Sequence, residues 1–207
     1  MLKVILFDID GVIIRPPQYY SSFLEEHGYR DAAKILNEYY ADGPNIKCLE
    51  GLADPLNSIK PFLDRIGWKQ TPREYFKQQF EYESGYVDHE IIQKITLLRS
   101  KGAVCLTATD QDSLRSKYLL DNLGFRNLFD DNFISCDIGF RKKDSEFWDY
   151  VLGMIKLRYP NVSAHEILFC DDILENIEIA AKSGIRTFHV KYSKDVISLF
   201  NFIDSNI

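Results

Sequence analysis

Residues 3–15 read K-V-I-L-F-D-I-D-G-V-I-I-R, an apolar run that leads directly into two aspartates. The segment 3–7 is rich in β-branched and aromatic residues and predicts a short buried strand. Because side chains alternate along an extended chain, Asp8 and Asp10 are expected to point to the same side. Two such carboxylates beside an apolar core require a cation, a raised pKa or a hydrogen-bond network. Gly11 then permits a sharp change of direction. By itself the stretch also fits a solvated turn, so the rest of the chain decides between the two interpretations.

From residue 88 onward, helical and strand-like segments alternate. Further strands are predicted at 103–107, 133–135, 166–170 and 186–190. Helices are predicted at 88–101, 112–123, 144–156, 173–182 and 196–203. Helices of this length between strands indicate right-handed crossovers. The sequence therefore predicts an α/β fold, a doubly wound, parallel, five-stranded sheet of the Rossmann-like type with helices on both faces.

The segment 16–85 has a different pattern. Its apolar residues, many of them aromatic, recur at helical spacing in four stripes, and Pro16-Pro17 can start the first helix. We expect a small all-helical subdomain here, inserted into an α/β domain made of residues 1–15 and 86–207. Aromatic stripes of this kind are mostly core packing, although five residues remain candidates for substrate contacts: Arg15, Tyr19, Tyr20, Tyr39 and Tyr40.

The composition is that of an ordinary globular protein, with 45% apolar and 27% charged residues among 207. The formal net charge of −6 gives no overall attraction to nucleic acid or to an anionic membrane, and we expect neither as a partner. No apolar run approaches the roughly 18 residues that a membrane span requires. An anionic substrate would therefore need a locally positive pocket or a bound metal.

The four cysteines are widely spaced and form neither a zinc-binding nor a redox motif. They are Cys48, Cys105, Cys136 and Cys170. Three of them belong to apolar strand-like runs, where a free thiol behaves as a small hydrophobic group. Together with the lack of a signal-peptide pattern before the first aspartate, this predicts a reducing, cytoplasmic location.

Polar residues follow four of the predicted strands. In parallel doubly wound sheets, ligands bind beyond the carboxyl ends of the strands. The residues at these ends are Asp8 and Asp10, then Thr109, Asp110 and Gln111, then Arg141, Lys142 and Lys143, and finally Asp171 and Asp172 with Asn176 close behind. Each group alone fits a helix cap or a solvated loop. All four groups, in this order, favour one shared site.

These residue types suit phosphoryl transfer. A carboxylate can attack phosphorus, and a second one can protonate the leaving oxygen and later activate water. A hard cation such as magnesium is needed between the anionic groups, and Asp8, the main-chain carbonyl of Asp10 and a carboxylate of the fourth strand would supply oxygen ligands. Thr109 and Lys142 would neutralise charge on the phosphoryl oxygens.

Four segments resemble the signatures of the haloacid dehalogenase-like (HAD) hydrolase superfamily, most of whose members are phosphatases. In order they read F-D-I-D-G-V, L-T-A-T-D-Q, G-F-R-K-K-D and F-C-D-D-I-L-E-N. The resemblance covers the whole predicted sheet domain. It implies that the helical insertion 16–85 occupies the place of the family's first type of cap domain.

The resemblance also implies individual roles. Asp8 would be the nucleophile and a magnesium ligand, and Asp10 the general acid and base that binds the metal through its backbone. Asp172 would bind the metal directly and Asp171 from the outer shell. Gly11 and Asn176 would support the site.

For phosphate binding, the resemblance points to Thr109 rather than Thr107, and to Lys142 with Lys143 as the alternative. Asp110 stands where relatives commonly have an asparagine that helps to hold phosphate. A negative charge at that position would either weaken phosphate binding or require a partner such as Lys142.

The predicted function is that of a magnesium-dependent phosphatase that hydrolyses a small phosphorylated metabolite through an aspartyl-phosphate on Asp8. Asp10 argues against the dehalogenases of the superfamily, which lack this acid. A phosphomutase is an alternative, although Tyr20 stands where such mutases usually carry a histidine. A non-catalytic module that binds phosphate or a partner is the third possibility.

Overall fold

The computed structural model describes residues 1–41, 43–192 and 194–207. Within these residues, five parallel strands form one sheet in the order β3-β2-β1-β4-β5. The strands are β1 (Val4–Phe7), β2 (Val104–Thr109), β3 (Asp131–Ile134), β4 (Ile167–Asp171) and β5 (Arg186–His189). The predicted fold class is confirmed.

Strand β1 lies at the centre of the sheet. Its last residue, Phe7, pairs with Thr107 of β2 on one side and with Cys170 of β4 on the other. The chain runs outward from β1 through β2 to β3 and then returns to place β4 on the opposite side of β1. The order of strands therefore reverses between β1 and β4, and ligands bind at such a point in sheets of this type.

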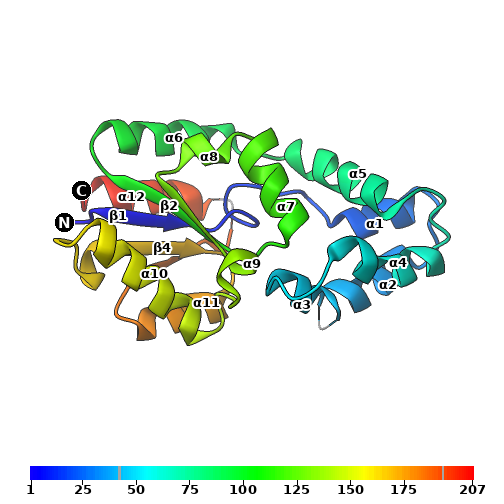
Figure 1. Cartoon of the computed structure of the whole chain (residues 1–207). Helices are drawn as coiled ribbons and strands as arrows, with labels where there is room; N and C mark the ends of the chain where they lie inside the picture. Colours follow the sequence, from blue (N-terminus) through cyan, green and yellow to red (C-terminus); the bar gives the residue numbers. More distant parts are fainter. Residues whose placement is uncertain (42, 193) are drawn as a thin grey trace.

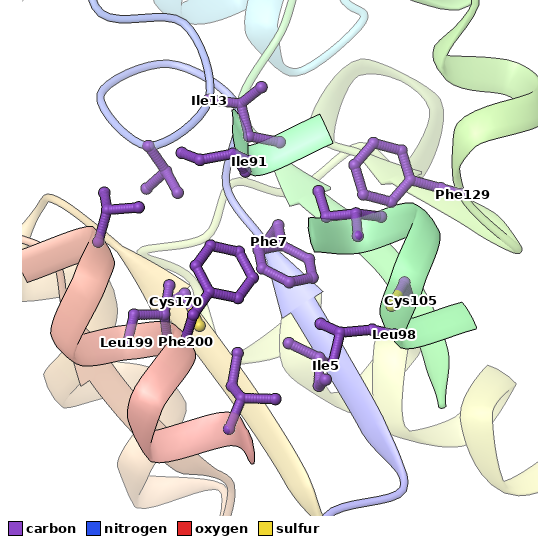
Figure 2. Close-up of a cluster of buried hydrophobic side chains, with 14 of the residues drawn as sticks. Ile5, Phe7, Ile13, Ile91, Leu98, Cys105, Phe129, Cys170, Leu199 and Phe200 are labelled. Carbon is purple, nitrogen blue, oxygen red and sulfur yellow. The ribbon is translucent and has the colours of Figure 1, made fainter. Parts of the chain in front are cut away.

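Helices cover both faces of the sheet (Figure 1). One face packs against α6 (His89–Ser100), α8 (Phe125–Leu128) and α12 (Asp195–Asp204), and the other against α10 (Ser145–Arg158) and α11 (Leu174–Lys182). The alternation along β1 produces these two layers, because Ile5 and Phe7 enter the first cluster, whereas Val4 and Leu6 enter the second. Figure 2 shows the first cluster, in which Phe7 stacks on Phe200 of α12 at 6.4 Å between ring centroids.

The predicted helix 112–123 has two parts. It begins as α7 (Ser113–Lys117), continues as the π-helical turn η1 (Tyr118–Asn122) and ends at Gly124, whose φ is +76°. Short elements next to strands were not predicted: α8 before β3, α9 (Ser135–Ile138) after β3 and the 3₁₀ turn η2 (Ala164–Glu166) before β4. Strand β3 also begins two residues earlier than predicted, because Asp131 and Asn132 interrupt the apolar pattern of this edge strand.

The chain between residues 20 and 84 is mostly helical. It contains α1 (Tyr20–Glu26), α2 (Ala32–Tyr40), α3 (Asn45–Leu49), α4 (Pro55–Arg65) and α5 (Pro72–Ser84). Helices α1, α2, α4 and α5 share a separate, largely aromatic core in which Tyr39 and Tyr75 are completely buried. The first helix starts at Tyr20 and not at Pro16-Pro17, since its N-cap residue Tyr19 is still in extended conformation. The residue before each of these prolines is also driven away from the helical conformation.

Two linkers connect this helical insert to the sheet, and they lie side by side. The amide of Arg15 donates to the carbonyl of Tyr86 at 3.2 Å, and the amide of Asp88 donates to the carbonyl of Ile13 at 2.8 Å. The side chains of Arg15 and Asp88 form an ion pair across the two linkers. In Figure 1 the insert lies beyond the carboxyl ends of the strands, next to α7 and α9.

No helix in residues 1–41, 43–192 and 194–207 combines the length and the apolar character that crossing a membrane would demand.

Candidate active site

Asp8 follows the last residue of β1 and its side chain is buried, with 4% of the residue exposed. Its backbone amide continues the sheet by donating to the carbonyl of Cys170 at 2.9 Å. One carboxylate oxygen, Oδ1, accepts the amide of Ile9 at 2.8 Å, and the other, Oδ2, lies 2.7 Å from the ammonium of Lys142. Both oxygens are therefore fixed in position.

Asp171 ends β4 and is completely buried. Its Oδ2 accepts from Lys142 Nζ at 2.7 Å and from Asn176 Nδ2 at 3.0 Å, while Oδ1 accepts the amide of Ile173 at 2.6 Å. Protein donors thus contact both oxygens of Asp171, as they do both oxygens of Asp8.

Asp172 is half-buried and completes a group of three acids. One carboxylate oxygen each from Asp8, Asp171 and Asp172 can be chosen so that all three lie within 4.8 Å of one another. Gly11 allows this approach, because a Cβ built on it would lie 2.2 Å from the carboxylate carbon of Asp172. Its φ of +80° also favours glycine. The donor set consists of oxygens alone and fits magnesium.

The charges at this edge do not balance. Burial raises the pKa of Asp8 and of Asp172, and the neighbouring Asp171 adds to both shifts. Burial alone would lower the pKa of Lys142, but Asp8 and Asp171 together raise it above its ordinary value and keep the ammonium charged. One ammonium among three carboxylates leaves an excess of negative charge, which favours the binding of a cation.

Hydrogen bonds to the backbone of Lys142 fix its position in the site. Its carbonyl accepts the indole N–H of Trp148 at 2.8 Å, and its amide donates to Asp110 Oδ1 at 2.9 Å. The other oxygen of Asp110 accepts from Arg141 Nε at 3.2 Å. The ion-pair partner of Asp110 is thus Arg141, where the sequence suggested Lys142. Lys143, the alternative to Lys142, points into solvent.

Thr109 is the last residue of β2 and is almost completely buried. Its Oγ1 accepts from Gln111 Nε2 at 3.0 Å. Thr107, two residues earlier, donates instead to Asn132 of β3 at 3.1 Å. The structure therefore directs Thr109, and not Thr107, toward the residues that follow the strands.

Asp10 has different surroundings from Asp8, since 53% of its side chain is exposed. Its Oδ2 accepts from Gln111 Nε2 at 2.8 Å, and its Oδ1 accepts from Arg115 Nη2 at 3.2 Å. The same nitrogen of Arg115 lies 3.0 Å from Glu83 Oε2, on the last turn of α5. The two aspartates of the first signature are thus held by separate sets of donors.

The sequence placed Gln111 among the polar residues after the second strand without a specific role, and it gave no role to Arg115 or Glu83. Arg115 lies on α7, whereas Gln111 precedes the N-cap Asp112 of that helix, so no helical spacing links the two in the sequence. Glu83 belongs to the insert, and nothing in the sequence links it to Asp10.

The five candidates for substrate contacts in and near the insert are mostly structural. Tyr20 and Tyr39 are buried in the aromatic core, and Tyr40 donates to Gln79 Oε1 at 2.7 Å. Tyr19 is 83% exposed. Arg15 pairs with Asp88 in the linkers.

Comparison with solved structures shows a shared fold. The structure resembles that of the HAD family enzyme BT-2542 from Bacteroides thetaiotaomicron, with a TM-score of 0.73 at 16% identity over 95% of this chain and 98% of that one. The wild-type form of that enzyme in complex with magnesium and inorganic phosphate gives a TM-score of 0.71 at 17% identity, covering 91% and 94%. L-2-haloacid dehalogenase from Xanthobacter autotrophicus, with chloropropionic acid covalently bound, gives 0.62 at 14% identity, covering 96% and 81%.

At the level of sequence, none of the curated proteins compared with the chain matches it. The family model of haloacid dehalogenase-like hydrolases, however, matches residues 2–184, which include β1, the helical insert and β4 with the residues after it. The chain belongs to the haloacid dehalogenase-like hydrolase family.

Proposed function

We propose that this hydrolase is a magnesium-dependent phosphatase that acts on a small phosphorylated metabolite, with the helical insert serving as a cap. The observation that carries the proposal is the contrast between its two neighbouring aspartates. Asp8 is buried against Lys142, whereas Asp10 is half-exposed and bound by Gln111 and Arg115. Two carboxylates in different surroundings suit two different roles, one as nucleophile and one as acid and base.

In this mechanism Asp8 attacks phosphorus and the bond to the leaving oxygen breaks, which gives an aspartyl-phosphate. Asp10 gives its proton to the leaving oxygen and then takes a proton from the water that hydrolyses the intermediate. Lys142 and the hydroxyl of Thr109 stabilise charge on the phosphoryl oxygens. Magnesium, bound by Asp8 and Asp172 with Asp171 in support, would neutralise charge between the nucleophile and the phosphate.

The second carboxylate favours phosphate esters over carbon–halogen bonds. A departing alkoxide is a strong base and needs a proton, whereas a halide leaves without one. Among the comparison structures, the complex of BT-2542 with magnesium and inorganic phosphate supports the proposal, whereas the Xanthobacter autotrophicus dehalogenase represents the carbon–halogen chemistry.

The direct test is phosphate release from p-nitrophenyl phosphate, with and without magnesium. We expect release by the wild type only with magnesium, and a loss of about 10³-fold or more in Asp8→Asn. Asp64→Asn, which changes an exposed aspartate of α4, is the control and should keep full activity. Release without magnesium, or full activity in Asp8→Asn, would contradict the proposal.

A further inference from the structure

Arg115 connects the insert to the first signature. It is a residue of α7, 4% exposed, and its guanidinium lies over the ring of Phe80 on α5 at 5.1 Å. A single nitrogen, Nη2, contacts both Asp10 Oδ1 at 3.2 Å and Glu83 Oε2 at 3.0 Å. A buried cation thus joins a carboxylate next to the nucleophile to a carboxylate of the helical insert.

The contacts of Glu83 continue into the insert. Its other oxygen, Oε1, accepts from Gln79 Nε2 at 2.8 Å, and Gln79 Oε1 accepts the hydroxyl of Tyr40 at 2.7 Å. The Tyr40 hydroxyl lies 3.3 Å from that of Tyr75. The position of Glu83 is therefore fixed by hydrogen bonds that connect α5 to Tyr40 of α2, and Arg115 links Glu83 to Asp10.

Stability alone is a poor explanation for this arrangement. A buried ion pair gains little over well-packed apolar side chains, because its charges lose their hydration. In addition, Nη1 of Arg115 is buried and has no hydrogen-bond partner within the described residues, which is a further cost. The arrangement is better explained by the orientation that it gives to Asp10, whose side chain is otherwise half-exposed.

We propose that Arg115 is a positioning residue that orients the carboxyl group of Asp10 toward the leaving oxygen, and that it does so only while Glu83 of the insert holds it. This inference rests on the proposed phosphatase function. It means that Asp10 is correctly oriented only when α5 is packed against α7. A substrate bound beneath a displaced insert would then meet a poorly placed acid.

The test compares two substrates of similar size that differ in their need for an acid. Phenyl phosphate has a strongly basic leaving group, whereas p-nitrophenolate leaves without much help from a proton. We expect Arg115→Lys and Glu83→Gln to lower kcat/KM about tenfold or more for phenyl phosphate and much less for p-nitrophenyl phosphate. Asp10→Asn should show the same selectivity, with a loss of about 10²-fold for phenyl phosphate.

Combining Arg115→Lys with Asp10→Asn should lower kcat/KM no further than Asp10→Asn alone, because both changes remove one function. Arg99→Lys is the matched control, since Arg99 pairs with Asp130 away from the site, and it should affect both substrates equally. Equal losses for the two substrates in Arg115→Lys, or losses that multiply in the double variant, would overturn the inference.

Hydrogen exchange separates this inference from the proposed function. The amides of Gly11, Ile13 and Ile14 are hydrogen-bonded within the loop that carries Asp10. In Glu83→Gln they should exchange faster than in the wild type, whether or not the protein releases phosphate. Unchanged protection of this loop would overturn the inference, whereas a lack of Asp8-dependent phosphate release would overturn the proposed function.

Discussion

Replacing Gly11 by alanine tests how closely Asp172 must approach the loop after β1. An alanine Cβ would lie 2.2 Å from the carboxylate carbon and from Oδ2 of Asp172, whereas contacts below 3.0 Å are essentially never seen for real Cβ atoms. The carboxylate would have to move by about 0.8 Å or more. The φ of +80° adds a backbone cost of about 1–2 kcal/mol for any residue with a Cβ.

A displacement of about 1 Å in a catalytic group can cost on the order of 10²-fold in rate. We therefore expect Gly11→Ala to lose about 10²-fold in kcat/KM for p-nitrophenyl phosphate, with a clearly weaker apparent affinity for magnesium. The assays are phosphate release over a magnesium titration and urea unfolding of the same samples.

Gly102→Ala is the matched control for the backbone cost. Gly102 has a φ of +92°, and a Cβ built on it meets no atom within 4 Å. It should lose about 1–2 kcal/mol of stability without a change in magnesium dependence. If Gly11→Ala behaved like Gly102→Ala in both assays, the account of Asp172 as a closely placed metal ligand would be refuted.

Two further predictions concern buried charges. Lys142→Met leaves Asp8 and Asp171 without their ammonium partner, so we expect the free energy of unfolding in urea to fall by about 3–5 kcal/mol without magnesium and by less with it. Lys143→Met, which changes an exposed lysine, should alter the free energy of unfolding little. An equal effect of the two substitutions would contradict the assigned charge balance. Burial raises the pKa of Glu83 from 4.5 to about 7, so the folded state binds its proton more tightly than the unfolded state does. As the pH rises from 4.5 to about 7, the free energy of unfolding of the wild type should therefore fall by on the order of 3 kcal/mol relative to that of Glu83→Gln. Urea titrations at several pH values measure this difference. A difference between the two proteins that does not change with pH would contradict the raised pKa.

The sheet was predictable because its strands are apolar runs that end in polar residues. Asp8, Thr109 and Asp171 end strands or follow them directly, and local periodicity identifies such strands, whereas Lys142 comes later, after β3 and α9. Their convergence then follows from the rule that the carboxyl ends of parallel strands meet at one edge.

The short helices α3, α8 and α9 were missed because four or five residues carry too little periodicity to be recognised. The contacts of Asp10 with Arg115, and of Arg115 with Glu83, join residues far apart in the chain through the packing of α5 on α7. Such contacts depend on tertiary structure, and no local pattern encodes them. The same holds for Asp110, whose partner Arg141 lies on the loop after the neighbouring strand.

In the proposed mechanism, Asp8 carries the phosphoryl group during hydrolysis. The most direct measurement is a rapid acid quench of the wild type turning over p-nitrophenyl phosphate with magnesium, followed by borohydride reduction and mass spectrometry of the peptide that contains Asp8 and Asp10. Borohydride converts an acyl phosphate into an alcohol, so the account predicts homoserine at position 8 and unmodified aspartate at position 10. Phosphate release without any modification of Asp8, or modification at Asp10 instead, would contradict it.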